Sequence, residues 1–482
     1  MKETLIIGAG LGGLFTGALL SRQGVRVKVL EKNRTIGGGL QNFVRGGEMY
    51  ETGMHVAGGF APGDSLYRIC NYLGIMDNLD IVQSDAVASV TFADTGRTYN
   101  LPAGRDAFVE YLSGLFPEEK DSLERYMEAI VRLSHEENLF YLESGYREHT
   151  DEFLMPADRF IAKYVSNPEL QALLAFVNPL YAGVPGHSPA YLHVMTSVLF
   201  IESPCRFGSG SSRLAAELER VIEQGGGQVL TGCEVAKVTV RDMRVTSVTD
   251  TKGREYTADT FVSDIHPQSL LERLDGKAFT TGYSSRLMSI PDTASAFKVF
   301  IRLKPGAIEN PGCPVSVTDS FANVWKRDGE WPHTVNCFMS GSHMTVFCLM
   351  DFSEVRKWEN TRTGHRGAEY EAWKKERTDR VLDLVEKRFP GIRDKSDDIF
   401  AASPLTFRDW YGTKNAGAYG YFKDCENLML SQVPVRTKVG NLFLTGQNVN
   451  MHGIGGVPMT AIETACAVLG NDFILNDIKQ TK

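Results

Sequence analysis

Several features are scarce in this sequence, and each scarcity excludes a class of function. No run of about 18 apolar residues occurs, so no segment is predicted to span a bilayer. Lys and Arg number 51 against 59 Asp and Glu, which gives a formal net charge of −8. Without a basic excess, the chain is predicted to bind neither nucleic acid through its phosphates nor a membrane through a polybasic anchor.

Paired cysteines and grouped histidines are also missing. None of the eight cysteines forms a Cys-x-x-Cys pair, and the ten histidines show no metal-ligand spacing. We therefore expect reduced thiols in a cytoplasmic protein and no structural metal. No cleavable apolar segment precedes the first predicted strand, so no signal peptide is expected. Peripheral contact with the inner membrane is the alternative location.

What the chain does contain is an ordinary globular composition, with 43% hydrophobic and 23% charged residues. Its 482 residues suffice for two or three domains. Most of the functional information lies in a few glycine-rich segments.

The first of these segments follows a short apolar strand at residues 4–7. Its sequence is Gly8-Ala9-Gly10-Leu11-Gly12-Gly13, and a predicted helix to Gln23 and a second strand ending at Glu31 come after it. This is the dinucleotide-binding beta-alpha-beta pattern. Gly8 allows the tight turn, Gly10 lets backbone approach a diphosphate, and Gly13 lets the helix lie close to the sheet. The helix N-terminus favours the diphosphate, and Glu31 can accept hydrogen bonds from ribose hydroxyls.

A second glycine cluster, Gly37-Gly38-Gly39, comes soon after Glu31. It is not part of the minimal fingerprint. It resembles the extended motif of flavoproteins with two dinucleotide-binding domains, where this segment lies over the FAD. The cluster therefore favours FAD over NAD as the tightly held cofactor, against the alternative of a flexible turn.

A hairpin is predicted next, with strands at residues 42–45 and 48–51 around a diglycine turn. The loop Glu51-Thr52-Gly53-Met54-His55 follows it and is a candidate flavin-facing segment. His55 is either a packed, hydrogen-bonded histidine or a residue beside the flavin ring.

The middle of the chain is predicted to be a cap over the cofactor. A charged helical run at residues 117–140 is interpreted as a solvated cover. Apolar residues recur at helical spacing in 168–177 and 189–201. These stripes are either core, or the wall of an apolar substrate tunnel, or a patch that dips into lipid.

The third glycine-rich segment is C-terminal. A strand at residues 439–447 runs into Gly446, and residues 453–460 are predicted to lead into a helix through Val468, with Pro458 in its first turn. Glycines there allow a planar ring to lie on the backbone, and the helix dipole can stabilise negative charge on a reduced flavin.

With these motifs in hand, the chain resembles the FAD-dependent carotenoid desaturase, carotenoid isomerase and retinol saturase group within the amine-oxidase-like flavoproteins. The acid-Thr-Gly-x-His loop of the retinol saturase branch looks like Glu51–His55, and its Ala-Tyr-Gly segment looks like Ala418-Tyr419-Gly420. The fold class implied is α/β, a Rossmann-like FAD-binding domain of the GR2 type with an inserted α+β substrate-binding cap. The expected FAD-binding domain is discontinuous, covering residues 1–75, 206–270 and 435–482, and the cap covers 76–205 and 271–434.

The motifs and the resemblance together predict the cofactor contacts. Gln447 departs from the family, since many relatives have Asp there, but a neutral amide can still hydrogen-bond the ribityl–phosphate region. The predicted FAD-binding residues are Gly8, Gly10, Leu11, Gly12, Gly13, Glu31, Lys32, Gly38, Gly39, Leu40, Met54, His55, Val235, Gly446, Gln447, Gly456, Val457 and Thr460.

The implied function is FAD-dependent oxidation or reduction of a carbon–carbon double bond in an apolar polyene or isoprenoid-like molecule, by hydride transfer at flavin N5. His55, Tyr419 and His452 are the catalytic candidates by motif location. The alternatives are a flavin-dependent carotenoid cis–trans isomerase, an amine-oxidase-like oxidase, or a flavin-free lipid-binding protein on the same fold. The substrate, the reaction direction and the oligomeric state stay open. So does the electron partner, for which NAD(P)H, a quinone and oxygen are the candidates.

Overall fold

The structure is a computed structural model that describes residues 2–145, 147–275 and 278–481. Its cofactor half is built on a five-stranded sheet in which all neighbours are parallel, in the order β20-β13-β1-β2-β9. Except for the edge strand β9, the strands of this sheet are mostly buried, as parallel strands covered on both faces must be. Their bounds are β1 (Glu3–Ile7), β2 (Arg26–Leu30), β9 (Gln228–Leu230), β13 (Thr260–Ser263) and β20 (Leu442–Leu444).

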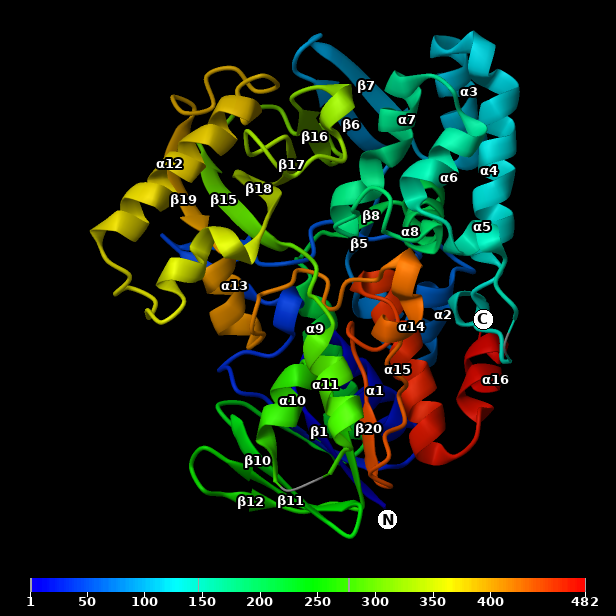
Figure 1. Ribbon diagram of the computed structural model, residues 1–482, viewed down its shortest axis with the longest axis vertical. Coiled ribbons are helices and arrows are strands. Elements are labelled where there is room, and N and C mark those ends of the chain that lie inside the picture. The colour runs from blue at the N-terminus through cyan, green and yellow to red at the C-terminus, as the bar shows by residue number, and fades with distance from the viewer. Residues whose placement is uncertain (1, 146, 276–277, 482) are drawn as a thin grey trace.

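Helix α1 (Leu11–Arg22) leaves the end of β1 and packs between α9 (Ser212–Gln224) and α15 (Gly453–Leu469). Almost every residue of α1 is buried, which explains its nearly uniform apolar character. A smaller four-stranded sheet lies at one end of this half, at the bottom of Figure 1. Its strands are β10 (Val235–Arg241), β11 (Arg244–Asp250), β12 (Glu255–Tyr256) and β14 (Leu274–Asp275).

The other half of the molecule carries a seven-stranded sheet in the order β19-β15-β18-β17-β16-β6-β7. Helix α12 (Ala368–Val385) lies against this sheet on the outer side of the molecule (Figure 1). The bounds are β6 (Ala86–Phe92), β7 (Arg97–Pro102), β15 (Ser295–Leu303), β16 (Val315–Thr318), β17 (Thr334–Ser340), β18 (His343–Met350) and β19 (Ser396–Ala402).

A group of cap helices lies beside that sheet, coloured cyan to teal in Figure 1. Helix α8 is central, because α4, α6 and α5 all pack against it. The group comprises α3 (Arg105–Leu115), α4 (Lys120–Ser134), α5 (Asp151–Leu154), α6 (Ala157–Tyr164), α7 (Pro168–Leu174) and α8 (Ala190–Glu202). The remaining strands form the hairpin of β3 (Asn42–Arg45) with β4 (Glu48–Glu51) and an antiparallel pair of distant strands, β5 (Ile81–Gln83) with β8 (Cys205–Phe207). The remaining α-helices are α2 (Ser65–Tyr72), α10 (Pro267–Arg273), α11 (Thr281–Ser289), α13 (Pro404–Tyr411), α14 (Leu428–Ser431) and α16 (Phe473–Gln480).

The predicted Rossmann-like α/β fold and the hairpin at 42–51 are confirmed. Two local predictions are wrong. The run at 117–140 is no solvated cover, because α4 buries a face of Leu123, Tyr126 and Ile130 against the cap core. Pro458 is not in the first turn of its helix, because Gly453–Gly456 are already helical and α15 begins five residues before the proline.

The domain division stays a prediction, to which the cores add a detail. Every strand of the five-stranded sheet lies in the segments predicted for the FAD domain. Leu287 and Ile290 of the predicted cap, however, pack into the core of that domain. A boundary near residue 290 therefore fits the packing better than 270. Among the described residues no helix is both long and apolar enough to cross a bilayer.

Candidate functional site

A single cavity of about 390 Å³ connects the two halves. One end lies against the turn after β1, and the other lies under the cap helices. Of the predicted site residues, all but three line this cavity; the exceptions are Gly13, Gly446 and Thr460. We call the end at the β1 turn the outer end and the end under the cap the inner end.

The three exceptions pack behind the lining. A Cβ on Gly13 would lie 2.1 Å from the carbonyl oxygen of Gly8, so this glycine serves helix–strand packing. A Cβ on Gly12 would lie 2.6 Å from the Cα of Gly446, which shows that the chain after β20 crosses directly over the start of α1. Thr460 is fully buried, and its hydroxyl donates to Gly456 O.

Glu31 holds the outer end together from the tip of β2. The backbone N–H of Ala9 donates to one carboxylate oxygen at 2.9 Å, and that of Asn33 donates to the other at 2.8 Å. Gly8 adopts a φ of 101°, in the left-handed region that favours glycine. The turn is therefore fixed by backbone geometry and by one buried carboxylate.

Asp264, at the end of β13, is a residue of the outer end that was not among the predicted site residues. A Cβ on Gly10 would lie 2.6 Å from one of its carboxyl oxygens, and a Cβ on Gly12 would lie 2.4 Å from the other. Burial raises the pKa of Asp264 to about 7, and hydrogen bonds from the N–H groups of Gly13 and Gly10 offset part of that shift. The glycines of the turn thus make room for this carboxyl as well as for a ligand.

A strap at residues 409–413, made of the end of α13 and the two residues after it, lies over the outer end. Lys32 Nζ donates to Asp409 O at 2.8 Å, Asn33 Nδ2 donates to Trp410 O at 3.2 Å, and Ser269 Oγ donates to Gly412 O at 3.0 Å. These three contacts all run from the cofactor half to the cap half.

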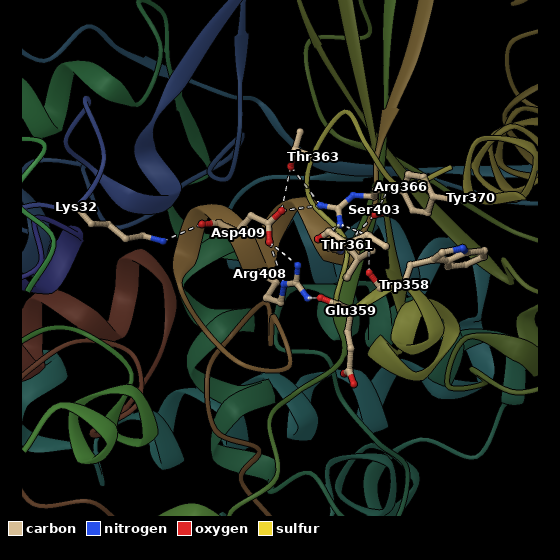
Figure 2. A network of polar contacts seen from close by, with 11 residues as sticks. Lys32, Trp358, Glu359, Thr361, Thr363, Arg366, Tyr370, Ser403, Arg408 and Asp409 are labelled. Carbon is tan, nitrogen blue, oxygen red and sulfur yellow. Dashed lines mark hydrogen bonds and ion pairs between the residues drawn. The ribbon is translucent and has the colours of Figure 1, made fainter. Parts of the chain in front are cut away.

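The strap is anchored on its far side by the carboxylate of Asp409 (Figure 2). Arg366 and Arg408 donate to it at 2.6 Å and 2.7 Å, and Thr363 donates at 3.0 Å. Burial alone would raise the pKa of Asp409, but these donors hold it below its ordinary value. In Figure 2, Lys32 bonds the backbone carbonyl of Asp409, and residues of the loop between β18 and α12 bond the carboxylate of the same residue.

The inner end contains a buried lysine that the sequence motifs did not indicate. Lys298 lies in the middle of β15, and its Nζ donates to Thr52 O at 2.6 Å and lies 3.0 Å from His55 Nε2. Its ammonium also faces the rings of Phe347 and Phe407 at 5.6 Å and 5.8 Å. Burial lowers the pKa of Lys298 to about 7, against a smaller opposite effect of Glu51.

His55 is packed and hydrogen-bonded, and it also lines the cavity. Its ring stacks on Phe338 with centroids 4.8 Å apart, and its Nδ1 lies 3.5 Å from Glu51 Oε2. Burial and the nearby Lys298 lower the pKa of His55 to about 4. The packed, hydrogen-bonded interpretation therefore describes the environment of His55, and its place beside the flavin ring stays a prediction.

The other two catalytic candidates line the inner end with their polar atoms already engaged. Tyr419 donates its hydroxyl to Pro179 O at 3.0 Å, and His452 Nε2 donates to Leu180 O at 3.3 Å. Burial raises the pKa of Tyr419 and lowers that of His452 to about 4. These contacts fasten the segment at Pro179 and Leu180 to the cavity, and a catalytic role for either residue stays a prediction.

The apolar stripes of the cap divide between core and cavity. Leu170, Leu173 and Leu174 lie in the cap core. Met195, Thr196, Leu199 and Phe200 of α8, however, line the inner end with Phe140 and Leu180. Helix α8 therefore belongs to the cap core and also lines the cavity, so the core interpretation of this stripe does not exclude a place on the cavity wall.

Away from the cavity, the fold brings together three groups that the sequence spacing did not join. The ligand atoms of His187, Asp424 and Glu426 lie within 4.8 Å of one another at the surface. The ion-pair contact of 3.3 Å between His187 and Asp424 accounts for this grouping. That the chain holds no structural metal stays a prediction.

Known proteins resemble the chain over its whole length. The family model described as flavin containing amine oxidoreductase matches residues 11–469. Among curated proteins, all-trans-retinol 13,14-reductase of Rattus norvegicus is 23% identical, with 97% of this chain and 85% of the relative covered. Prolycopene isomerase 2, chloroplastic, of an Oncidium hybrid cultivar is 23% identical over 87% of this chain and 75% of the relative. Among solved structures, an oxidoreductase from Methanosarcina mazei superposes with a TM-score of 0.68 at 17% identity, covering 97% of this chain and 100% of that one.

Proposed function

The chain belongs to the family of flavin containing amine oxidoreductases, and from that premise we propose that it is an FAD-dependent enzyme acting on a carbon–carbon double bond of an apolar, polyene or isoprenoid-like substrate. One observation carries the proposal. A single cavity joins a dinucleotide-binding turn to an apolar inner end that contains a buried lysine. The relatives named for reactions on retinol and prolycopene support the same substrate class.

The residues at the outer end fit an FAD. Gly8, Gly10 and Gly12 form a cradle without side chains at the N-terminus of α1, which suits a diphosphate. Thr413 lines the same cavity, and its buried Oγ1 has no hydrogen-bond partner among the described residues, so a ligand could satisfy it. The predicted cofactor contacts that line the cavity are the residues we propose to hold the FAD.

When bound, the flavin supplies hydride transfer at N5. The protein supplies the rest. Lys298 holds a proton at the inner end, where phenylalanine and leucine side chains exclude water. Saturation adds a hydride to one alkene carbon and the Lys298 proton to the other, while desaturation returns both along the same paths. A pKa near 7 suits an acid that must also act as a base at neutral pH.

The charge at the inner end argues against an amine substrate, although the family is named for amine oxidoreductases. The acids that line the described part of the cavity are Glu31, Glu234 and Asp264, and all three lie toward the outer end. A cationic amine would meet Lys298 with no carboxylate to receive it. A flavin-dependent isomerase remains the second candidate, because a relative is named for that reaction.

The test begins with the absorbance spectrum of the purified protein and mass spectrometry of whatever it carries. All-trans-retinol and a poly-cis carotene are then offered anaerobically to the chemically reduced enzyme. A product two hydrogens heavier, formed as the flavin is oxidised, supports the proposal. A geometric isomer of unchanged mass supports the isomerase. A colourless protein, or peroxide release with amines instead of polyenes, overturns both. NAD(P)H, a quinone and oxygen are compared in the same assay, and NAD(P)H is the donor we propose for saturation.

A further inference from the structure

Lys298 needs a route by which its proton is replaced, because the residue is enclosed. The residue is 2% exposed, and both neighbours on its strand, Phe297 and Val299, are fully buried. A solvent proton cannot reach such an amine directly. The polar atom that it faces besides Thr52 O is Nε2 of His55, at 3.0 Å.

His55 connects Lys298 to a residue that reaches the surface. Because Nε2 accepts from the lysine, Nδ1 carries the ring proton, and it points toward Glu51 Oε2 at 3.5 Å. The side chain of Glu51 is 18% exposed, whereas that of His55 is 5% exposed. The other Glu51 oxygen accepts from the N–H of Ser211 at 2.8 Å, which fixes the carboxylate in place. Stacking on Phe338 fixes the plane of the imidazole.

We propose that Glu51, His55 and Lys298 form a proton relay between solvent and the inner end of the cavity. This inference rests on the proposed function, because the relay serves to replace the proton that Lys298 donates to the substrate. Lys298 is the group that meets the substrate, and His55 and Glu51 act through it. Glu51 ends β4, His55 lies in the loop that follows it, and Lys298 lies in β15, so the relay exists only where the hairpin meets the cap sheet.

The proton balance of one saturation is closed by this path. One N–H bond of the Lys298 ammonium breaks as a C–H bond forms on the substrate, and a bound reduced flavin would supply the hydride for the other carbon. The imidazole then changes from the Nδ1–H to the Nε2–H tautomer. Glu51 takes a proton from solvent and passes it to Nδ1, while Nε2–H passes its proton to the amine. The end state is the arrangement observed, with the lysine donating to Nε2. The imidazole tautomer must be reset once in each turnover.

Charges around the relay suit this direction of transfer. The charge of Glu51 raises the pKa of Lys298, and the charge of Lys298 lowers the pKa of Glu51. Burial alone would raise the pKa of Glu51, but hydrogen bonds from His55 and Ser211 lower it below its ordinary value. The relay thus has a carboxylate at its solvent side and an ammonium at its cavity side, with a neutral imidazole between them.

The test uses the flavin-loaded enzyme and needs no substrate. At pH 8 the bound flavin is reduced by light with an external donor, and proton uptake is followed with an indicator dye. Reduction would add negative charge to the cavity that Lys298 lines, so the amine should be protonated from solvent in addition to the proton that the flavin itself takes up. Lys298→Met should leave the flavin's own uptake and abolish this additional uptake. Glu51→Gln should slow it by roughly tenfold or more, since a positioned acid–base group contributes at least that much. Glu48→Gln, on the same strand with its carboxylate near His343 instead, is the matched control and should be unchanged.

A structural effect is separated from a relay by rescue. Glu51→Ala with added formate should regain the uptake rate, because a small acid can occupy the partly exposed position. Equal uptake rates in the wild type and Glu51→Gln, or a slow Glu51→Ala that formate does not restore, would overturn the relay. NMR titration of Lys298 in the flavin-free protein gives a second readout, in which Glu51→Gln should lower the lysine pKa. Absence of flavin or of any polyene reaction would count against the proposed function, and uptake that is insensitive to Glu51 would count against the relay alone.

Discussion

The two ends of the cavity are built in different ways. The outer end consists largely of backbone: glycines of one local turn, held by two carboxyl groups, those of Glu31 and Asp264. The inner end consists of side chains such as His55, Lys298 and Tyr419, which come from segments hundreds of residues apart. A site that binds through backbone is specified by local sequence, whereas a site that acts through side chains is specified only by the complete fold. Substitutions should therefore affect the two ends differently.

Replacement of Lys298 should abolish proton donation at the inner end without changing cofactor binding at the outer end. Lys298→Met preserves most of the side-chain volume and removes the proton donor. We expect the chemical step to fall by about 10³-fold, within the range for a general acid. Flavin content should be unchanged. Stopped-flow oxidation of the reduced flavin by the substrate identified above measures the step, and a normal rate in this variant would remove Lys298 from the mechanism.

The dependence of the unfolding free energy on pH should also report on the buried lysine of the inner end. The folded state holds Lys298 with a pKa of about 7, far below the value of 10.5 in the unfolded chain, so the unfolded state binds the extra proton between these pH values. Stability is therefore lowest below pH 7 and rises toward pH 10, by at most about 1.4 kcal/mol per pH unit for this group. Lys423, with a pKa lowered to about 8 by burial, contributes similarly.

Urea denaturation of the wild type and Lys298→Met between pH 6.5 and 9.5 measures this effect. The variant should have a shallower slope, and Lys423→Met serves as the comparison with a buried lysine outside the cavity. Parallel slopes in the wild type and Lys298→Met would mean that the buried amine keeps an ordinary pKa.

At the outer end, substitution of a glycine should act through steric overlap with the neighbouring backbone. Gly12→Ala places a methyl group 2.6 Å from the Cα of Gly446, so the strand end and helix start must separate. We expect a loss of about 1–3 kcal/mol in unfolding free energy and a large loss of bound flavin. Gly114→Ala, in α3 with open space around its Cα, is the matched control and should be neutral or stabilising. Equal flavin content in the two variants would contradict the packing argument.

The smallest effects should come from the contacts that fasten each end. Tyr419→Phe removes the hydrogen bond to Pro179 O and should cost about 1 kcal/mol of stability with the chemical step unchanged. Lys32→Met removes the contact to Asp409 O and should speed flavin release a few-fold, again without changing the chemical step. Flavin release into excess apoprotein and single-turnover rates measure these two effects. A slow chemical step in Tyr419→Phe would instead support a role for this tyrosine as the catalytic acid.

The sequence predicted the outer end because its determinants are contiguous. Gly8–Gly13 and Glu31 act through local backbone geometry, which their spacing displays. Lys298 was missed, although a signal was present: a lysine inside the otherwise apolar segment Ala296–Ile301 must be buried with a partner or exposed at an edge. Nothing local distinguishes these cases, since the partner is His55, 243 residues away. Asp264 was passed over for the same reason, because the glycines around it come from two distant segments, the turn after β1 and the chain after β20.

The order of strands in the cofactor sheet also governs how the protein is made. Strand β1 leaves the ribosome long before its neighbour β13, which pairs with it at Thr260, and β20 completes the sheet only at Leu444. At about 5–20 residues per second, the first strand waits for tens of seconds before its sheet can close. Contacts this distant in sequence fold slowly and leave edges exposed. Synthesis in vivo should therefore depend on chaperones, and nonsense mutations that remove β20 should yield aggregated chains instead of shortened enzymes.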